Sequence, residues 1–113
     1  MFRTSKDAIV ICDAEGRLVY FNEATRELHG KDFKYLTPEQ WPSTFNLYHP
    51  DGTLMQTHEV PLFRANQGEK LTDVPMMISP AGERPRRLLA SGEPLFDRSG
   101  RKLGAVVVMR KSP

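Results

Sequence analysis

Three histidines, one cysteine and a scatter of acids are the residues of this 113-residue chain that could do chemistry. The histidines are His29, His49 and His58, and no HExxH motif, cysteine cluster or nucleophile elbow accompanies them. The glycines stand singly at expected turns, so no phosphate-binding loop is present. The sequence therefore predicts neither an enzyme nor a metal site.

His58 is the histidine with a specific chemical alternative. It lies six positions before Arg64, close to an expected helix. A neutral imidazole there could ligate haem iron, and Arg64 could reach a haem propionate. Pro61, however, suits the first turn of the helix, which leaves His58 in the entry loop facing solvent. The leading expectation is no cofactor, with haem kept as an alternative.

The lone cysteine, Cys12, lies in the apolar run AIVIC and is expected to be a small buried hydrophobe. It cannot form an internal disulfide, which agrees with a reducing compartment. The longest apolar run, from Ala105 to Met109, is far shorter than a membrane span, and the acidic residues near the N-terminus disagree with a secretory signal. We therefore expect a cytoplasmic location.

Charge is distributed unevenly along the chain. Residues 84–113 hold eight of the 16 Lys and Arg residues but only two of the 14 Asp and Glu residues. A basic end can mark a nucleic-acid surface, but these residues fall in or beside expected turns. No aromatic residues interleave with the arginines to stack on bases, so nucleic-acid binding is not expected.

The elements that would position a functional site meet in the stretch from Tyr48 to Glu69. Asp51-Gly52 predicts a tight turn, and residues 60–67 are expected to form a short helix that starts at Pro61 and stops at Gly68. The inner face of that helix is apolar except for one amide, Asn66. This pattern suits a helix that closes a small cavity over a sheet, and equally plain core packing.

Five β-like runs surround this central helix. They are expected at residues 8–12, 17–21, 70–79, 86–94 and 102–110. Asn22 is expected to cap a helix over residues 23–29, and Thr37 to cap a single turn ending at Trp41. With helices only between the second and third strands, the sequence predicts one α+β domain over residues 1–113: an antiparallel sheet in the order 2-1-5-4-3 with short helices on one face.

Together, these features resemble a PAS domain. The match rests on the opening AIVICDAEGRLVYFNEATRELHG, on YHPDGT and EVPLFRANQGE, and on the closing PLFDRSGRKLGAVVVM. The resemblance implies a sensory module of a bacterial signalling protein, joined to an effector such as a histidine kinase, diguanylate cyclase or transcription regulator. The photoactive flavin type has its cysteine in an Asn-Cys-Arg context after the first helices. Since Cys12 lies in the first strand, flavin is disfavoured.

The leading functional hypothesis is a module that binds a small molecule between the sheet and the helices. Strand parity and helix position select its pocket residues. They are Val10, Cys12, Met76, Ile78, Leu89 and Val106 from the sheet, and Trp41, Leu62, Phe63 and Asn66 from the helical side. A parity error of one residue would exchange the two faces of a strand.

A protein-interaction and dimerisation module with a filled core is the rival hypothesis. In it, Trp41, Phe63, Met76 and Met77 pack without a ligand, and the outer face of the sheet binds another chain. Both hypotheses expect a homodimer through contacts between PAS domains and an effector domain in the same polypeptide.

Overall fold

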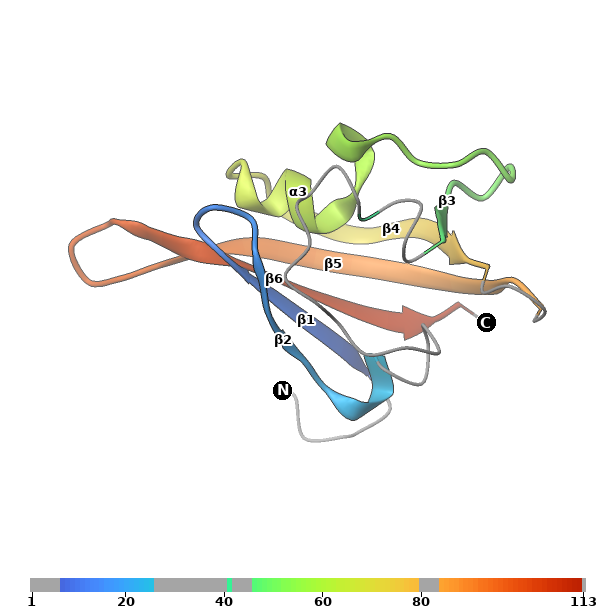
Figure 1. The fold of residues 1–113 in the computed structure, drawn as a ribbon, viewed down its shortest axis with the longest axis horizontal. Helices are drawn as coiled ribbons and strands as arrows, with labels where there is room; N and C mark the ends of the chain where they lie inside the picture. Colours follow the sequence, from blue (N-terminus) through green and yellow to red (C-terminus); the bar gives the residue numbers. More distant parts are fainter. Residues whose placement is uncertain (1–6, 26–40, 42–45, 80–83, 113) are drawn as a thin grey trace.

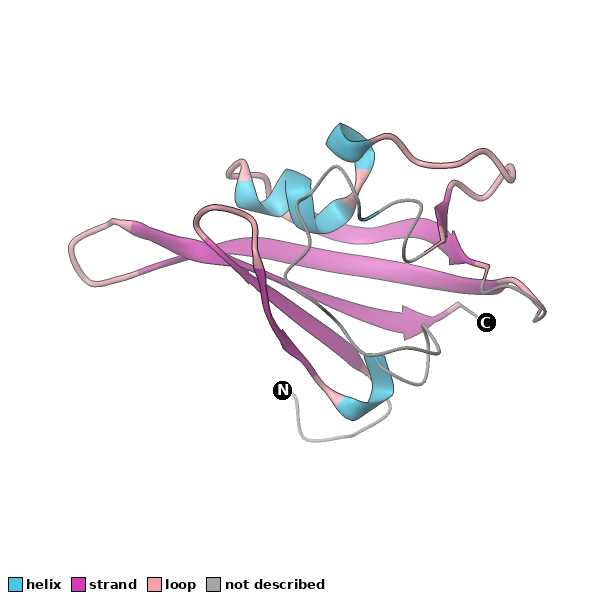
Figure 2. Cartoon of the chain, viewed as in Figure 1, coloured by secondary structure: helices cyan, strands magenta, loops and turns pink. Residues whose placement is uncertain are grey.

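A twisted antiparallel sheet carries the helical segments on one of its faces (Figure 1; Figure 2). The computed structural model describes residues 7–25, 41, 46–79 and 84–112. Its named elements are β1 (Ala8–Asp13), β2 (Leu18–Phe21), β3 (Leu47–Tyr48), the 3₁₀ turn η2 (Thr57–Glu59), α3 (Pro61–Asn66), β4 (Leu71–Ile78), β5 (Arg86–Phe96) and β6 (Lys102–Lys111).

The described strands form one six-stranded sheet in the order β2-β1-β6-β5-β4-β3. The α+β class and the relative order of the five predicted strands are confirmed, but the predicted number of strands is wrong. The additional strand is β3, in which Leu47 pairs with Ile78 and Tyr48 with Met77. Two residues are too few to show an alternating pattern, so β3 had no detectable signal in the sequence.

Asn22 joins the opening hairpin to the segment that follows it. Its Oδ1 accepts hydrogen bonds from the backbone N–H groups of Ile9 and Thr25, both at 3.0 Å. Its Nδ2 donates to the Asp7 carbonyl at 2.8 Å. The predicted N-cap is thus confirmed. Most of the helix expected over residues 23–29 and most of the expected turn that ends at Trp41 lie outside the described residues.

The central stretch folds as its turn residues predict. The Asp51 carboxylate accepts hydrogen bonds from the backbone N–H and the hydroxyl of Thr53, and Gly52 adopts φ 93°. Pro61 is the first residue of α3, and Gly68, at φ 108°, follows its end. α3 packs mainly on β5 and β6, so it lies over the centre of the sheet.

Alternation along the central strands divides the sheet into two faces. On β1, Ala8, Val10 and Cys12 are buried beneath the helical layer, whereas Ile9 and Ile11 are half-buried on the other face. Because successive side chains point to opposite faces of a strand, each apolar run supplies residues to both. The core therefore lies between the sheet and α3, and the outer face keeps a partly exposed apolar strip.

β5 and β6 form a long hairpin whose tip extends beyond the rest of the molecule (Figure 1). Close to the turn of that hairpin, Gly104 on β6 lies opposite Asp13 on β1 and adopts φ 150°. A Cβ atom at Gly104 would lie 2.0 Å from the carbonyl oxygen of Cys12. Only glycine permits this approach of the two strands.

Replacement of Gly104 by alanine is expected to destabilise the fold by about 3 kcal/mol or more, because steric overlap with β1 adds to left-handed backbone strain. Gly100→Ala is the matched control, since Gly100 also has positive φ (88°) but a Cβ atom added there would meet nothing within 4 Å. That control should cost only about 1–2 kcal/mol. Urea denaturation of both variants measures the difference, and equal losses would contradict the steric argument.

Candidate functional site

A small apolar cavity of about 40 Å³ lies between the sheet and the helical side of the molecule. Residues from both layers line it. From the sheet these are Val10, Leu18, Phe21, Leu47, Met76, Val107 and Met109, and from the helical side Trp41, Val60, Pro61 and Leu62. This volume is close to that of one or two water molecules, far below the roughly 300–1,000 Å³ of ordinary ligand pockets.

The start of α3 forms one wall of this cavity. Val60 precedes the helix and Pro61 fixes its first turn, so Leu62 is directed onto the sheet and is 5% exposed. Opposite it, Val107 and Met109 project inward from β6 because they share one parity on the strand. A movement of α3 relative to β6 would therefore change the size of the cavity.

The indole N–H of Trp41 is buried and has no hydrogen-bond acceptor among the described residues. Trp41 is 2% exposed and lines the cavity. A buried donor without a partner costs about 1–3 kcal/mol relative to one that is satisfied. Trp41 is thus a core residue, as its sequence context indicates, and its indole N–H is buried without an acceptor among the described residues.

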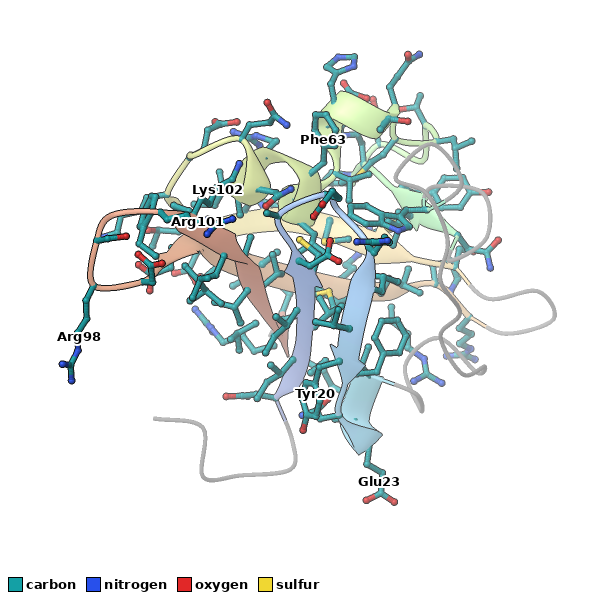
Figure 3. All side chains as sticks on the ribbon, turned by 60° about the vertical axis from the view of Figure 1, so that its left-hand side comes forward. Tyr20, Glu23, Phe63, Arg98, Arg101 and Lys102 are labelled. Carbon is teal, nitrogen blue, oxygen red and sulfur yellow. The ribbon has the colours of Figure 1, made fainter. Side chains whose placement is uncertain are left out.

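Four of the ten predicted pocket residues line the cavity: Val10, Trp41, Leu62 and Met76. Cys12 and Ile78 lie on the predicted face but are buried in the core outside the lining. Phe63 is half-buried and packs against the core from α3 (Figure 3).

Asn66 lies at the other end of α3 from the cavity. Its Nδ2 donates to the Ala14 carbonyl in the β1–β2 turn at 3.3 Å, and its own carbonyl accepts a hydrogen bond from the Lys102 ammonium. Its buried Oδ1 has no partner within the described part of the chain. Figure 3 shows Lys102 close to α3 and Arg98 at the far tip of the hairpin. Asn66 therefore links α3 to two hairpins and does not line the cavity.

Leu89 and Val106 point away from the cavity, so their predicted placement on the inner face is wrong. On β5 the buried side chains are those of Leu88 and Ala90, and on β6 those of Ala105, Val107 and Met109. Val106 pairs with exposed Glu93 and half-buried Ile11 on the outer face. A parity error of one residue accounts for both corrections.

Seven lining residues were missed by sequence reasoning. They are Leu18, Phe21, Leu47, Val60, Pro61, Val107 and Met109. A signal existed for some: Leu18 and Phe21 bracket the exposed pair Val19 and Tyr20, although the β1–β2 pairing contains a bulge that breaks strict alternation. Leu47 lies on β3, a strand that the sequence did not predict, since its apolar surroundings have no clear period and suit short helical turns over a core.

The residues of the haem alternative do not fit a haem site in this cavity. His58 is exposed on η2 and does not line the cavity, and Arg64 pairs with Glu69 at 3.1 Å. The volume is too small for a haem or a flavin ring, and the described lining has no histidine to ligate haem iron. Among the described residues, no group of three or more His, Cys, Asp or Glu side chains could hold a metal ion, and no helix is long and apolar enough to cross a membrane.

The outer face of the sheet has a second, larger hollow of about 460 Å³. Val106 and Val108 form part of its floor, and Asp7, Lys70 and Glu93 stand among its lining. The neighbouring strand adds Ile9 and Ile11, which pair with Val108 and Val106 respectively. We call the four half-buried aliphatic residues Ile9, Ile11, Val106 and Val108 the outer strip.

Comparisons with known proteins agree with this architecture. A family model described as the PAS fold matches residues 2–111. No curated protein matches the sequence.

Several solved structures are similar in fold. The PAS domain of a protein from Colwellia psychrerythraea is 20% identical, with a TM-score of 0.62 over 94% of this chain and 86% of that chain. The light-state dimer of the fungal blue-light photoreceptor Vivid is 16% identical, with a TM-score of 0.66 over 98% and 80% of the two chains. The Vibrio cholerae VqmA dimer is 15% identical, with a TM-score of 0.68 over 99% and 48%. At these identities the likeness shows the fold alone.

Cys12 offers a direct check on the packing next to the cavity. Cys12 is 1% exposed, and this burial raises the pKa of its thiol from an ordinary 9.0 to about 11. Since the folded-state pKa lies above that of the unfolded chain, the neutral thiol contributes its full stability below about pH 9. The contribution disappears as the pH rises through 11.

The unfolding free energy of the wild type relative to Cys12→Ala is therefore expected to fall by about 1–2 kcal/mol between pH 8.5 and pH 10.5. Chemical denaturation of both proteins across this range measures it, and the alanine variant removes the contribution of every other titrating group. A difference that stays constant with pH would show that the thiol is not desolvated.

Proposed function

The chain belongs to the PAS-fold family, a family of sensory and interaction modules, and on that premise we propose that it binds a small molecule in the cavity beneath α3. Binding changes the position of α3 against the sheet, and the sheet passes this change to an effector domain of the same polypeptide. The observation that carries the proposal is the cavity itself, which lies between a short helix and the central strands.

The connections of α3 support a relay. At its N-terminal end, Leu62 lines the cavity. At its C-terminal end, Asn66 contacts Ala14 in the β1–β2 turn and Lys102 on β6. Ala14 directly follows β1 and Lys102 begins β6, and these two strands pair with each other. A shift of α3 caused by a ligand would therefore act on the two strands nearest the chain termini.

Filling the cavity should prevent ligand binding without unfolding the protein. Val107→Leu adds a methylene to a cavity-lining position, and Val108→Leu makes the same change one residue further along β6, on the outer face. We expect Val107→Leu to lose the bound molecule and to change stability by less than about 1.5 kcal/mol, because the cavity receives the added group.

Native mass spectrometry of the purified protein provides the measurement. The wild type and Val108→Leu should both carry an added mass that is released on denaturation. If the wild type carries no added mass, and ligand screening with a small-molecule library also finds no binder, the sensing function is rejected.

A second function, dimerisation, is favoured by the outer strip. The strip is apolar, and residues of both charge signs, Asp7, Lys70 and Glu93, lie around the adjoining hollow. A two-fold interface brings the same patch of two copies together, so it needs apolar area at its centre and both signs of charge around it. We propose that a second copy of this chain covers the strip.

Val106→Lys should shift such a dimer to the monomer, because it places a charge at the centre of the strip. Leu103→Lys is the matched control: Leu103 is also an apolar residue of β6, 53% exposed, but lies on the extended part of the hairpin. Light scattering after size-exclusion chromatography reports the mass, and circular dichroism confirms that both variants are folded. A wild-type monomer at high micromolar concentration would contradict the proposal.

A further inference from the structure

The tip of the β5–β6 hairpin extends beyond the rest of the molecule (Figure 1). We call residues 95–103, which form this tip, the arm. It carries the two most exposed large apolar side chains of the described residues, Phe96 at 56% on β5 and Leu103 at 53% on β6. Exposed apolar side chains that gather at one protruding point, with polar residues around them, mark a surface that contacts another protein or a membrane.

A fixed turn closes the arm. The backbone N–H of Asp97 donates to the Arg101 carbonyl at 2.9 Å. One oxygen of the Asp97 carboxylate accepts hydrogen bonds from the backbone N–H and the hydroxyl of Ser99 and from the backbone N–H of Arg101. Gly100 supplies the left-handed conformation of the turn, at φ 88°. Because the tip is preformed, it loses little conformational entropy when it binds a partner.

The arm is also basic. It holds Arg98, Arg101 and Lys102 against one acid, Asp97, so its net charge is +2. The Lys102 ammonium donates to the Asn66 carbonyl on α3. Arg98 and Arg101 are exposed and form no ion pair with a described residue. Figure 3 shows Arg98 at the far end of the hairpin, pointing away from the domain. The arm thus presents two cations beside its apolar side chains, which is complementary to an anionic partner.

The shape of the arm distinguishes between two kinds of anionic partner. A stable protein interface covers about 800 Å² of each partner, from roughly 20–30 residues. The arm is a single narrow hairpin tip, so a protein would have to enclose it in an acidic groove. A bilayer needs no preformed groove, because its lipids move apart around an apolar side chain while their charged headgroups stay level with nearby arginines. A lipid surface therefore suits a protruding tip better.

We propose that the arm binds an anionic lipid surface. Phe96 and Leu103 are buried at the level of the lipid headgroups, and Arg98 and Arg101 pair with lipid phosphate and carboxylate groups. This interaction goes beyond the proposed sensing function and does not depend on a ligand in the cavity. Two arginines and two apolar side chains give weak, reversible binding, comparable to one signal of a two-signal membrane anchor.

Co-sedimentation of the full chain with vesicles tests the proposal. Vesicles of phosphatidylcholine with about 30% phosphatidylserine should bind the wild type about 30-fold more tightly than vesicles of phosphatidylcholine alone, because each of the two arginines contributes about a fivefold factor. Salt at about 0.5 M should remove most of this difference, since it screens surface charges. No sedimentation with the anionic vesicles at low salt would overturn the proposal and leave an acidic protein groove as the partner of the arm.

Arg98→Gln tests the electrostatic part and should weaken binding to the anionic vesicles about fivefold. Arg87→Gln is the matched control. It removes the same charge from an exposed side chain of β5, at the opposite end of that strand from the arm, and should change binding much less. Equal losses in the two variants would show that net charge alone attracts the domain, and would overturn the assignment to the arm.

Phe96→Ser tests whether the arm inserts into the lipid surface or only adsorbs to it. This variant should bind the anionic vesicles about fivefold more weakly, because an apolar side chain no longer leaves water. Tyr20→Ser is its control, since it removes an aromatic side chain that is 46% exposed on β2. Unchanged binding of Phe96→Ser, or an equal loss in Tyr20→Ser, would overturn insertion through the arm. The replaced side chains are exposed, and circular dichroism confirms that the variants are folded.

A spectroscopic measurement on the wild type locates the contact without any substitution. Nitroxide-labelled lipids in anionic bicelles should broaden the amide NMR signals of residues 95–103 and spare those of β2. Broadening that spares the arm would overturn the proposal even if the protein sediments with vesicles.

Discussion

The pairing of β6 with β1 is the interaction on which the rest of this structure depends. It joins the last strand to the first through a continuous register from Ala8 opposite Met109 to Asp13 opposite Gly104. Without it, the two halves of the sheet would be separate, and the β1–β2 hairpin alone would be too small to be stable. The pairing also places Val10 beside Val107 and so forms the floor of the cavity. The close approach at Gly104 fixes where this register ends.

Above this floor, α3 is held differently at its two ends. Its first turn rests on apolar contacts through Leu62, which can slide because such contacts have no strong direction. Its last turn is held by directional hydrogen bonds from Asn66 and Lys102. A helix fixed at one end and adjustable at the other is well suited to change its angle when the cavity is filled. The mechanical basis of the proposed relay lies in this asymmetry.

The central strands are apolar on both faces, and this has two consequences. One face packs on α3 and forms the core, while the other carries the outer strip, whose residues are only half-buried in a single chain. Sheets covered on both sides have such strands, whereas sheets exposed on one side usually alternate clearly. The composition of β1 and β6 therefore fits a covered outer face. Because both faces are apolar, these strands lack the alternation of apolar and polar residues that would show which side chains point inward.

The sequence by itself determined the turns, the helix start at Pro61 and the cap at Asn22, because each depends on residues close together in the chain. It also determined the relative order of five strands, which depends on how the hairpins connect. Only the tertiary structure decided which way Leu89 and Val106 point, since a run such as AVVVM satisfies either parity until Gly104 is set against Asp13. It alone added β3, and it alone brought Trp41 to the cavity wall with an N–H that no described residue accepts. Cavities and orphaned donors arise from contacts between distant segments, and for that reason no local pattern encodes them.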